Sequence, residues 1–217
     1  MVYRVDRPES VCVLLRKGYR VGTAIIVQPY DGWMSVDPAK LRIEIYPTKV
    51  LRTKGLEIEV NEETRAVAAR MVELMREAEG IGLAAPQVGL SWRLFVAHVP
   101  LHEDDPVDSE IPCSSEDFQV FFNPEIVEFS KDMEGYEEGC LSLPDLTGEV
   151  RRPTTVTMKA LDMDRNPVEL QATGLMGRCW QHEIDHLDGI MILDKMTQMS
   201  RLKNRSIIRE YKRAEKG

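Results

Sequence analysis

The segment QHEIDH, residues 181–186, restricts the possible folds of this chain more than any other feature. It places His182 and His186 four positions apart, with Glu183 directly after the first histidine. Residues four apart share one face of an α-helix, with their Cβ atoms roughly 5–6 Å from each other. Two imidazoles at this spacing can bind one metal ion, and the adjacent carboxylate can reach a water molecule beside it. The sequence therefore predicts a helix over 175–187 that carries a metal site.

This helix is also expected to be buried, because the residues before the motif, GLMGRCW, are mostly apolar. Two histidines and two acidic residues are costly to bury without partners, and a metal ion provides one. A catalytic metal site usually has three protein ligands and one open position. Cys140, in the segment EEGCLSLP, is a candidate for the third ligand, since a thiol ionises on binding a metal. The alternative is that Cys140 is a small buried hydrophobic residue.

The length and composition are typical of one globular domain with appendages: 217 residues, of which 43% are apolar and 29% charged. No apolar run approaches the ~20 residues of a membrane span, and the first residues do not resemble a secretory signal. We therefore expect a cytoplasmic protein without a membrane partner. Four cysteines without a CxxC pair argue against disulfides, so Cys12 and Cys113 are expected to be buried thiols.

The net charge of −8 argues against DNA binding, which needs a basic field. The charge is also unevenly distributed along the chain. Residues 101–117, which include His102, carry seven acidic side chains and no Lys or Arg, as is typical of a solvated surface loop. Residues 200–217 carry seven Lys or Arg and two Glu, and are expected to form a basic helix that begins at Ser200. The charge of this helix favours either contact with the phosphates of an RNA or simple solvation.

Hydrophobic periodicity predicts the remaining elements. A helix is expected from Asn61, a good N-cap, to Glu79, with Gly80 at its end. Residues 80–89 are expected to form a turn-rich loop. Strands are expected at 93–99, which contains His98, and at 120–122, 126–129, 154–161 and 168–172. Helices and strands are segregated along the chain, which favours an α+β fold.

Three parts are expected along the chain. Residues 1–41 are an N-terminal extension, of which 1–33 is either an upstream extension of the reading frame or a genuine arm packed on the domain. Residues 42–199 are the catalytic domain, and residues 200–217 are the basic C-terminal helix.

Three segments together resemble the peptide deformylase family: GIGLAAPQVG at 80–89, EGCLSLP at 138–144 and QHEIDH at 181–186. They occur in that family's order and at its approximate spacing, and the resemblance covers roughly residues 42–199. It implies an α+β fold in which antiparallel sheets pack around a central metal-binding helix, with an N-terminal helix and a C-terminal helix.

The resemblance also implies a role for individual residues. The implied metal ligands are Cys140, His182 and His186. Glu183 resembles the general acid and base, while the side chain of Gln87 and the backbone N–H of Leu141 resemble the donors to the developing oxyanion. The implied substrate-binding residues are Ile81, Gly82, Leu175 and Cys179.

The implied activity is hydrolytic removal of the formyl group from the initiator methionine of nascent polypeptides. The expected partners are therefore N-formylmethionyl peptides and, through the basic C-terminal segment, ribosomal RNA, unless that segment is merely solvated. A sulfur and two imidazoles suit several divalent metals. The resemblance implies Fe(II) in the cell, with Zn, Ni or Co possible in a purified sample. Two alternatives remain open: an HExxH metallopeptidase that cleaves internal peptide bonds, and a non-catalytic deformylase-like protein that binds peptides or ribosomes.

Some positions depart from the family pattern or have two interpretations. Many members have an Arg shortly after the cysteine segment, where this chain has Thr147 and Gly148. Arg178 is expected to be solvated or paired with an acid rather than to contact substrate. Four further charged residues either hold the ligands in place or form ordinary surface pairs: Glu138, Arg151, Arg152 and Asp185.

Overall fold

The computed structural model describes residues 35–101 and 110–214. Residues 1–34, and with them Cys12 and nearly all of the expected N-terminal extension, lie outside the described residues, as does His102. The expected division into three parts therefore stays a prediction. None of the described helices is long and apolar enough to cross a membrane.

The described chain contains five α-helices, seven strands and three short 3₁₀ turns. The helices are α1 (Glu62–Glu77), α2 (Gly174–Leu187), α3 (Ile192–Lys195), α4 (Gln198–Lys203) and α5 (Arg205–Ala214). The strands are β1 (Gly82–Ala84), β2 (Leu94–Ala97), β3 (Gln119–Phe129), β4 (Met133–Gly139), β5 (Thr147–Pro153), β6 (Thr155–Leu161) and β7 (Pro167–Thr173).

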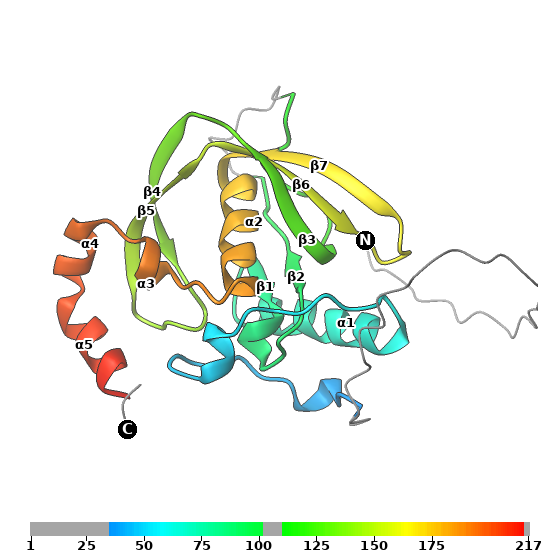
Figure 1. The fold of residues 1–217 in the computed structure, drawn as a ribbon, viewed down its shortest axis with the longest axis horizontal. Coiled ribbons are helices and arrows are strands. Elements are labelled where there is room, and N and C mark those ends of the chain that lie inside the picture. Colours follow the sequence, from blue (N-terminus) through cyan, green and yellow to red (C-terminus); the bar gives the residue numbers. More distant parts are fainter. Residues whose placement is uncertain (1–34, 102–109, 215–217) are drawn as a thin grey trace, which may run out of the picture. The chain divides into compact units, whose positions relative to one another are not determined.

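Five strands form one antiparallel sheet in the order β1-β2-β3-β6-β7, with helices packed on both faces. Strand β2 shows why: Leu94 and Val96 pack in the core cluster of α1, whereas Phe95 and Ala97 pack in that of α2. Alternate side chains of a strand point to opposite faces, so a strand that is apolar throughout is buried on both sides. Helix α2 packs on one face of this sheet, as Figure 1 shows.

The second sheet is the antiparallel pair β4-β5, which lies on the other side of α2 (Figure 1). A third core cluster packs against this pair of strands and contains Val150 of β5 together with Leu143 and Leu146, which lie between the two strands in the sequence. Three residues of α5 pack against that cluster: Ile207, Ile208 and Tyr211. The α+β fold, with antiparallel sheets around a central helix and a helix near each end of the described chain, is confirmed.

Several expected elements are confirmed. Helix α1 begins after Asn61, whose side chain accepts a hydrogen bond from the Thr64 amide at 3.0 Å and so caps the helix. The hairpin β6-β7 pairs Thr155 with Thr173 and turns at residues 162–166, as its two alternating segments indicate. Cys113 is buried, as expected of an inert thiol.

Other expectations were wrong. Residues 80–89 are not only a loop, because they contain β1, which pairs with β2. The two strands expected at 120–122 and 126–129 are one strand, β3, with an irregularity at Asn123, which has a φ of 50°. Thr197, not Ser200, caps the first C-terminal helix: the Ser200 amide donates to its hydroxyl. The basic segment is two helices, separated at Asn204, rather than one.

Candidate metal centre and active site

Helix α2 carries most of the site, and close packing fixes its position against the sheet. A Cβ at Gly177 would lie 2.7 Å from the backbone oxygen of Ala172, so only glycine permits this approach. Trp180 is 1% exposed, and its ring lies edge-on to Phe121 of β3, with centroids 5.4 Å apart. These contacts anchor one face of the helix, and the opposite face presents the motif residues.

Three potential ligand atoms converge beside this helix. The sulfur of Cys140 and one ring nitrogen each from His182 and His186 all lie within 4.8 Å of one another. Cys140 Sγ is 3.2 Å from His186 Nε2. Cys140 follows β4 directly, so the β4-β5 pair delivers the sulfur and α2 delivers both histidines.

The chemistry of this donor set fits a divalent transition metal. One soft sulfur and two imidazoles are a usual combination for such ions, and three protein ligands leave a position open. Two buried polar atoms at the site have no hydrogen-bond partner among the described residues, His186 Nδ1 and Glu183 Oε2. The residues present therefore fit the metal that the motif implies.

Glu138 holds His182 in place from behind. Its Oε2 lies 3.1 Å from His182 Nδ1, which leaves the other ring nitrogen free to face the metal position. The same carboxylate receives two hydrogen bonds from Arg152, at 2.7 and 2.9 Å, and one from Arg178 at 2.8 Å. Burial alone would raise the pKa of Glu138, but the hydrogen bonds from Arg152 and His182 outweigh it and hold that pKa far below its ordinary value.

Asp185 extends this network on the far side of Arg152. Arg152 Nη1 donates to Asp185 Oδ2 at 2.7 Å, and Lys195 Nζ lies 3.2 Å from Asp185 Oδ1. The sequence left open whether four charged residues hold the metal ligands in place or form ordinary surface pairs. Three of them, Glu138, Arg152 and Asp185, lie in one network behind the histidines. Arg151 is exposed and takes no part in it.

Gln87 and Leu141 border the metal position from the other side. The Oε1 atom of Gln87 accepts a hydrogen bond from the Ala84 amide at 2.8 Å, which fixes the direction of its amide group. Its Nε2 then lies 3.6 Å from Cys140 Sγ and 3.4 Å from Ser142 Oγ. Leu141 follows Cys140, so its backbone amide is adjacent to the sulfur ligand. The amide group of Gln87 therefore faces the sulfur of Cys140, and Leu141 adjoins that cysteine in the chain.

Glu183 lies against β1, and the absence of a side chain at Gly82 makes room for it. A Cβ at Gly82 would lie 2.3 Å from Glu183 Oε1 and 2.8 Å from Cys179 Sγ. Glu183 is 4% exposed, and burial raises its pKa to about 7. A carboxyl group with a pKa near neutrality can both accept and release a proton at the working pH.

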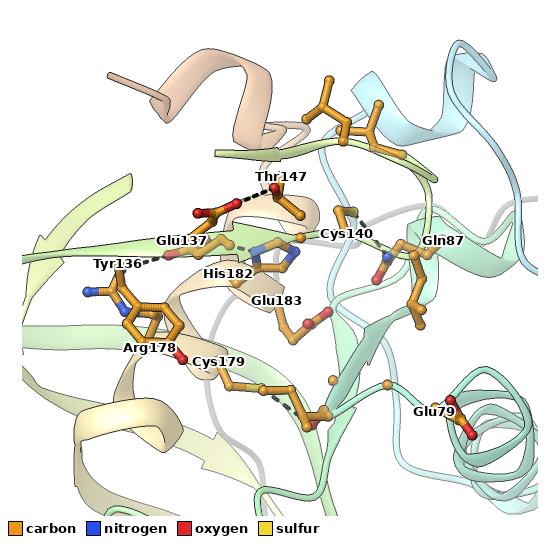
Figure 2. A pocket seen from close by; sticks show the side chains of 18 of the residues that line it. Glu79, Gln87, Tyr136, Glu137, Cys140, Thr147, Arg178, Cys179, His182 and Glu183 are labelled. Carbon is orange, nitrogen blue, oxygen red and sulfur yellow. Dashed lines mark hydrogen bonds and ion pairs between the residues drawn. The ribbon is translucent and has the colours of Figure 1, made fainter. Parts of the chain in front are cut away.

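A cavity of about 520 Å³ opens beside these residues (Figure 2). All four residues implied as substrate-binding line it, namely Ile81, Gly82, Leu175 and Cys179. Cys140, His182, Glu183, Gln87 and Leu141 line it too, whereas His186 lies behind and is 1% exposed. The Cys179 thiol donates to the backbone oxygen of Ile81 at 3.4 Å, and the sulfur is a wall of the cavity rather than part of the ligand cluster.

The family model for polypeptide deformylase matches residues 40–202. The chain belongs to this family. Peptide deformylase 2 of Gloeobacter violaceus is 42% identical over 157 residues, which span 72% of this chain and 79% of that protein. A peptide deformylase of Rhodopseudomonas palustris is 42% identical over 175 residues, 80% of this chain and 94% of that protein.

Solved structures of deformylases have the same fold. The peptide deformylase of Ehrlichia chaffeensis is 34% identical, with a TM-score of 0.71 over 81% of this chain and 97% of that one. That of Plasmodium falciparum is 36% identical, with a TM-score of 0.70 over the same shares. As a deformylase, the chain is a metal-dependent hydrolase that removes N-formyl groups from peptides. A metallopeptidase and a non-catalytic binding protein are not favoured.

Some lining residues of the deformylase cavity were missed from the sequence. Tyr136 and Glu137 belong to β4, which no apolar pattern indicated. Asp145 follows the cysteine segment, and Glu79 follows α1. Thr147, which the sequence marked only as a departure from the family pattern, lines the cavity as well. Arg178 was expected to be solvated or paired with an acid; it is paired with Glu138, but it is also buried and lines the cavity.

Proposed function

We propose that this deformylase acts through a divalent metal ion held by Cys140, His182 and His186, with Glu183 as the proton carrier. The observation that supports this most strongly is the convergence of the three ligand atoms within 4.8 Å beside a buried carboxylate whose Oε2 has no partner in the described part of the chain. When bound, such an ion lowers the pKa of water from 15.7 towards ~7 and polarises a carbonyl oxygen.

The protein supplies the remaining steps. Glu183 accepts the proton of the attacking water at Oε2 and delivers it to the nitrogen of the leaving amine. Gln87 Nε2 and the Leu141 amide donate hydrogen bonds to the oxygen on which negative charge develops. Losing one donor of this kind typically raises the barrier by ~3–4 kcal/mol. The products are formate and a free N-terminal amine.

Substrate positioning follows from the cavity walls. We propose that the methionine side chain lies among Ile81, Leu175 and Cys179, since a flexible thioether fills irregular apolar space well. The peptide backbone would lie in extended form beside Gly82, as an added strand next to β1. This mode recognises backbone rather than sequence, which suits an enzyme acting on many different nascent chains. We place that action in the cytoplasm, with Fe(II) as the metal in the cell and Zn, Ni or Co as substitutes in purified protein.

A formate assay combined with metal analysis tests this proposal. Anaerobically purified protein is expected to release formate from formyl-Met-Ala-Ser and to contain about one divalent metal ion per chain. Cys140→Ser is expected to reduce metal content and activity together, by more than tenfold, because a hydroxyl is a poor substitute for a thiolate ligand. Cys113→Ser, a buried thiol outside the site, is the matched control. Full metal content in Cys140→Ser would contradict the assigned ligand set.

We also propose that the outer face of α5 contacts ribosomal RNA. Its inner face packs on the third core cluster, so its basic side chains remain exposed: Arg205, Arg209, Lys212 and Arg213. Each neutralised phosphate releases counterions, so binding would weaken steeply with salt. The alternative is a helix that is merely solvated.

Charge removal is a better test of this contact than deletion. Tyr211 donates to the Pro144 oxygen at 2.8 Å and Asn204 to the Thr147 oxygen at 2.7 Å, so deleting residues 200–217 would also disturb the cavity wall. The triple change Arg209→Gln, Lys212→Gln, Arg213→Gln is expected to reduce ribosome co-sedimentation about tenfold or more in low salt, with formate release retained. Unchanged co-sedimentation would contradict the contact.

A further inference from the structure

The open end of the substrate cavity is lined by carboxylates from both sides. Glu79 lies between α1 and β1, Glu137 is on β4, and Asp145 is in the turn after the cysteine segment. All three are exposed. Figure 2 shows Glu79 and Glu137 on opposite sides of the Glu183 carboxylate. The acidic side chains therefore belong to different elements that line one cavity, and their exposure places them on its solvent side.

These carboxylates are not neutralised by neighbouring cations. Glu79 and Asp145 have no ion pair or side-chain hydrogen bond with any described residue, and Glu137 accepts a hydrogen bond only from the neutral Thr147 hydroxyl. Arg178 is the one Lys or Arg among the described residues that line the cavity. Its guanidinium already donates hydrogen bonds to the Glu138 carboxylate and to the backbone oxygens of Val150 and Glu134.

Observations that do not involve these three charges also indicate that the cavity binds a ligand. Glu183 is buried and its unpartnered Oε2 belongs to a residue lining the same space. The family acts on peptides, and the proposed path places the formyl end at the metal ligands and the first side chain against Leu175 and Cys179. The following residues of the peptide must leave through the open end, past the carboxylates.

We infer that this enzyme selects for Lys or Arg at the second and third residues of the formylated peptide, through Glu79, Glu137 and Asp145. The inference rests on the proposed function and specifies its substrate class. Each exposed charge pair changes an equilibrium by a factor of about 1.5 to 5, so two such contacts together span about 2- to 25-fold. We expect a value in the middle of this range, about 3- to 10-fold in kcat/KM. Because the pairs are exposed, the preference must shrink when salt screens them.

Formate release from matched peptides tests the inference. The substrates are formyl-Met-Lys-Lys-Ser, formyl-Met-Gln-Gln-Ser and formyl-Met-Glu-Glu-Ser, assayed at about 0.02 M and about 0.5 M salt, where the Debye length falls from roughly 20 Å to roughly 4 Å. At low salt kcat/KM is expected to rise about 3- to 10-fold from the Gln to the Lys peptide and to fall from the Gln to the Glu peptide. At high salt the three values are expected to converge.

A double variant assigns the preference to the cavity mouth. The double variant Glu79→Gln, Asp145→Asn keeps the size of both side chains and removes two charges. The ratio of kcat/KM for the Lys peptide to that for the Gln peptide should therefore fall towards one. A change in catalysis that affects both peptides equally cancels in this ratio. The control Glu128→Gln, Asp164→Asn removes the same charge from exposed residues outside the cavity and should leave the ratio unchanged.

Three results would overturn the inference: no preference in the parent enzyme, a preference that survives the mouth variant, or an equal loss in the control variant, which would indicate the net charge of −8 instead. Absence of formate from the Gln peptide would refute the proposed function, which is a separate outcome.

Discussion

Glu183→Gln is expected to lower kcat for formyl-Met-Ala-Ser by about 10²- to 10⁴-fold while metal content stays the same. Glutamine has the same shape and fits beside Gly82, but it cannot accept a proton. Glu183 is not among the three converging ligands, so the change leaves the metal-binding atoms in place. Because its Oε2 has no partner in the described residues, no existing side-chain contact of that atom is lost.

The measurement combines steady-state formate release with elemental analysis of the same sample. The matched control is Asp188→Asn, which removes an acid at the end of the same helix; Asp188 pairs with Arg93 outside the cavity. That variant is expected to stay within a factor of about three of the parent. A Glu183→Gln enzyme with full metal and activity within tenfold of the parent would contradict the proton-carrier role.

Glu138→Ala is expected to have the largest effect on stability, a loss of about 3–5 kcal/mol in the free energy of unfolding. The change removes the one carboxylate that faces both Arg152 and Arg178, which are 4% and 6% exposed. A buried guanidinium without its counter-charge is far more costly than a missing pair. His182 also loses the contact at Nδ1, and loss of such a partner typically weakens metal binding about 10- to 100-fold.

Urea unfolding of metal-free protein isolates the stability effect, and competition with a chelator measures the metal affinity. Glu134→Ala is the matched control, since Glu134 is exposed on the same strand and contributes only its backbone oxygen to Arg178. It is expected to change the free energy of unfolding by less than about 0.5 kcal/mol. Equal unfolding curves for the two variants would contradict the role of Glu138 as the centre of the network.

The sequence predicted those parts of the fold that leave a strong local pattern. Helix α1 has an N-cap at Asn61 and an apolar stripe, and the β6-β7 hairpin alternates around a short polar turn. The pair β4-β5 has no such pattern, because the buried positions of β5 are occupied by Gly148, Val150 and Arg152. A charged residue on a strand is expected to be exposed, and the carboxylates of Glu138 on the paired strand and of Asp185 on α2 make the burial of Arg152 possible.

Some residues of the candidate site could likewise be predicted from the sequence, and others could not. The clustering of Cys140, His182 and His186 could be predicted, because an HExxH motif and a lone thiol between a glycine and a proline are unusual in themselves. Glu79, Glu137 and Asp145 could not, because an exposed acidic residue carries no mark of what it borders. Their position around one opening depends on α1, β4 and the turn after Cys140 meeting in space, which no local pattern encodes.

Gly82 also limits how this enzyme can be made more heat-resistant. Exchanging glycine for alanine commonly stabilises a protein by about 0.4–1 kcal/mol, because the unfolded chain loses freedom. At Gly82 the added methyl group would lie 2.3 Å from Oε1 of Glu183, so this carboxylate would have to leave the position from which we propose that it transfers a proton. Stabilising substitutions must therefore be sought elsewhere in the chain. A library of variants selected only for thermal stability could retain alanine at this position in proteins that no longer hydrolyse formylated peptides.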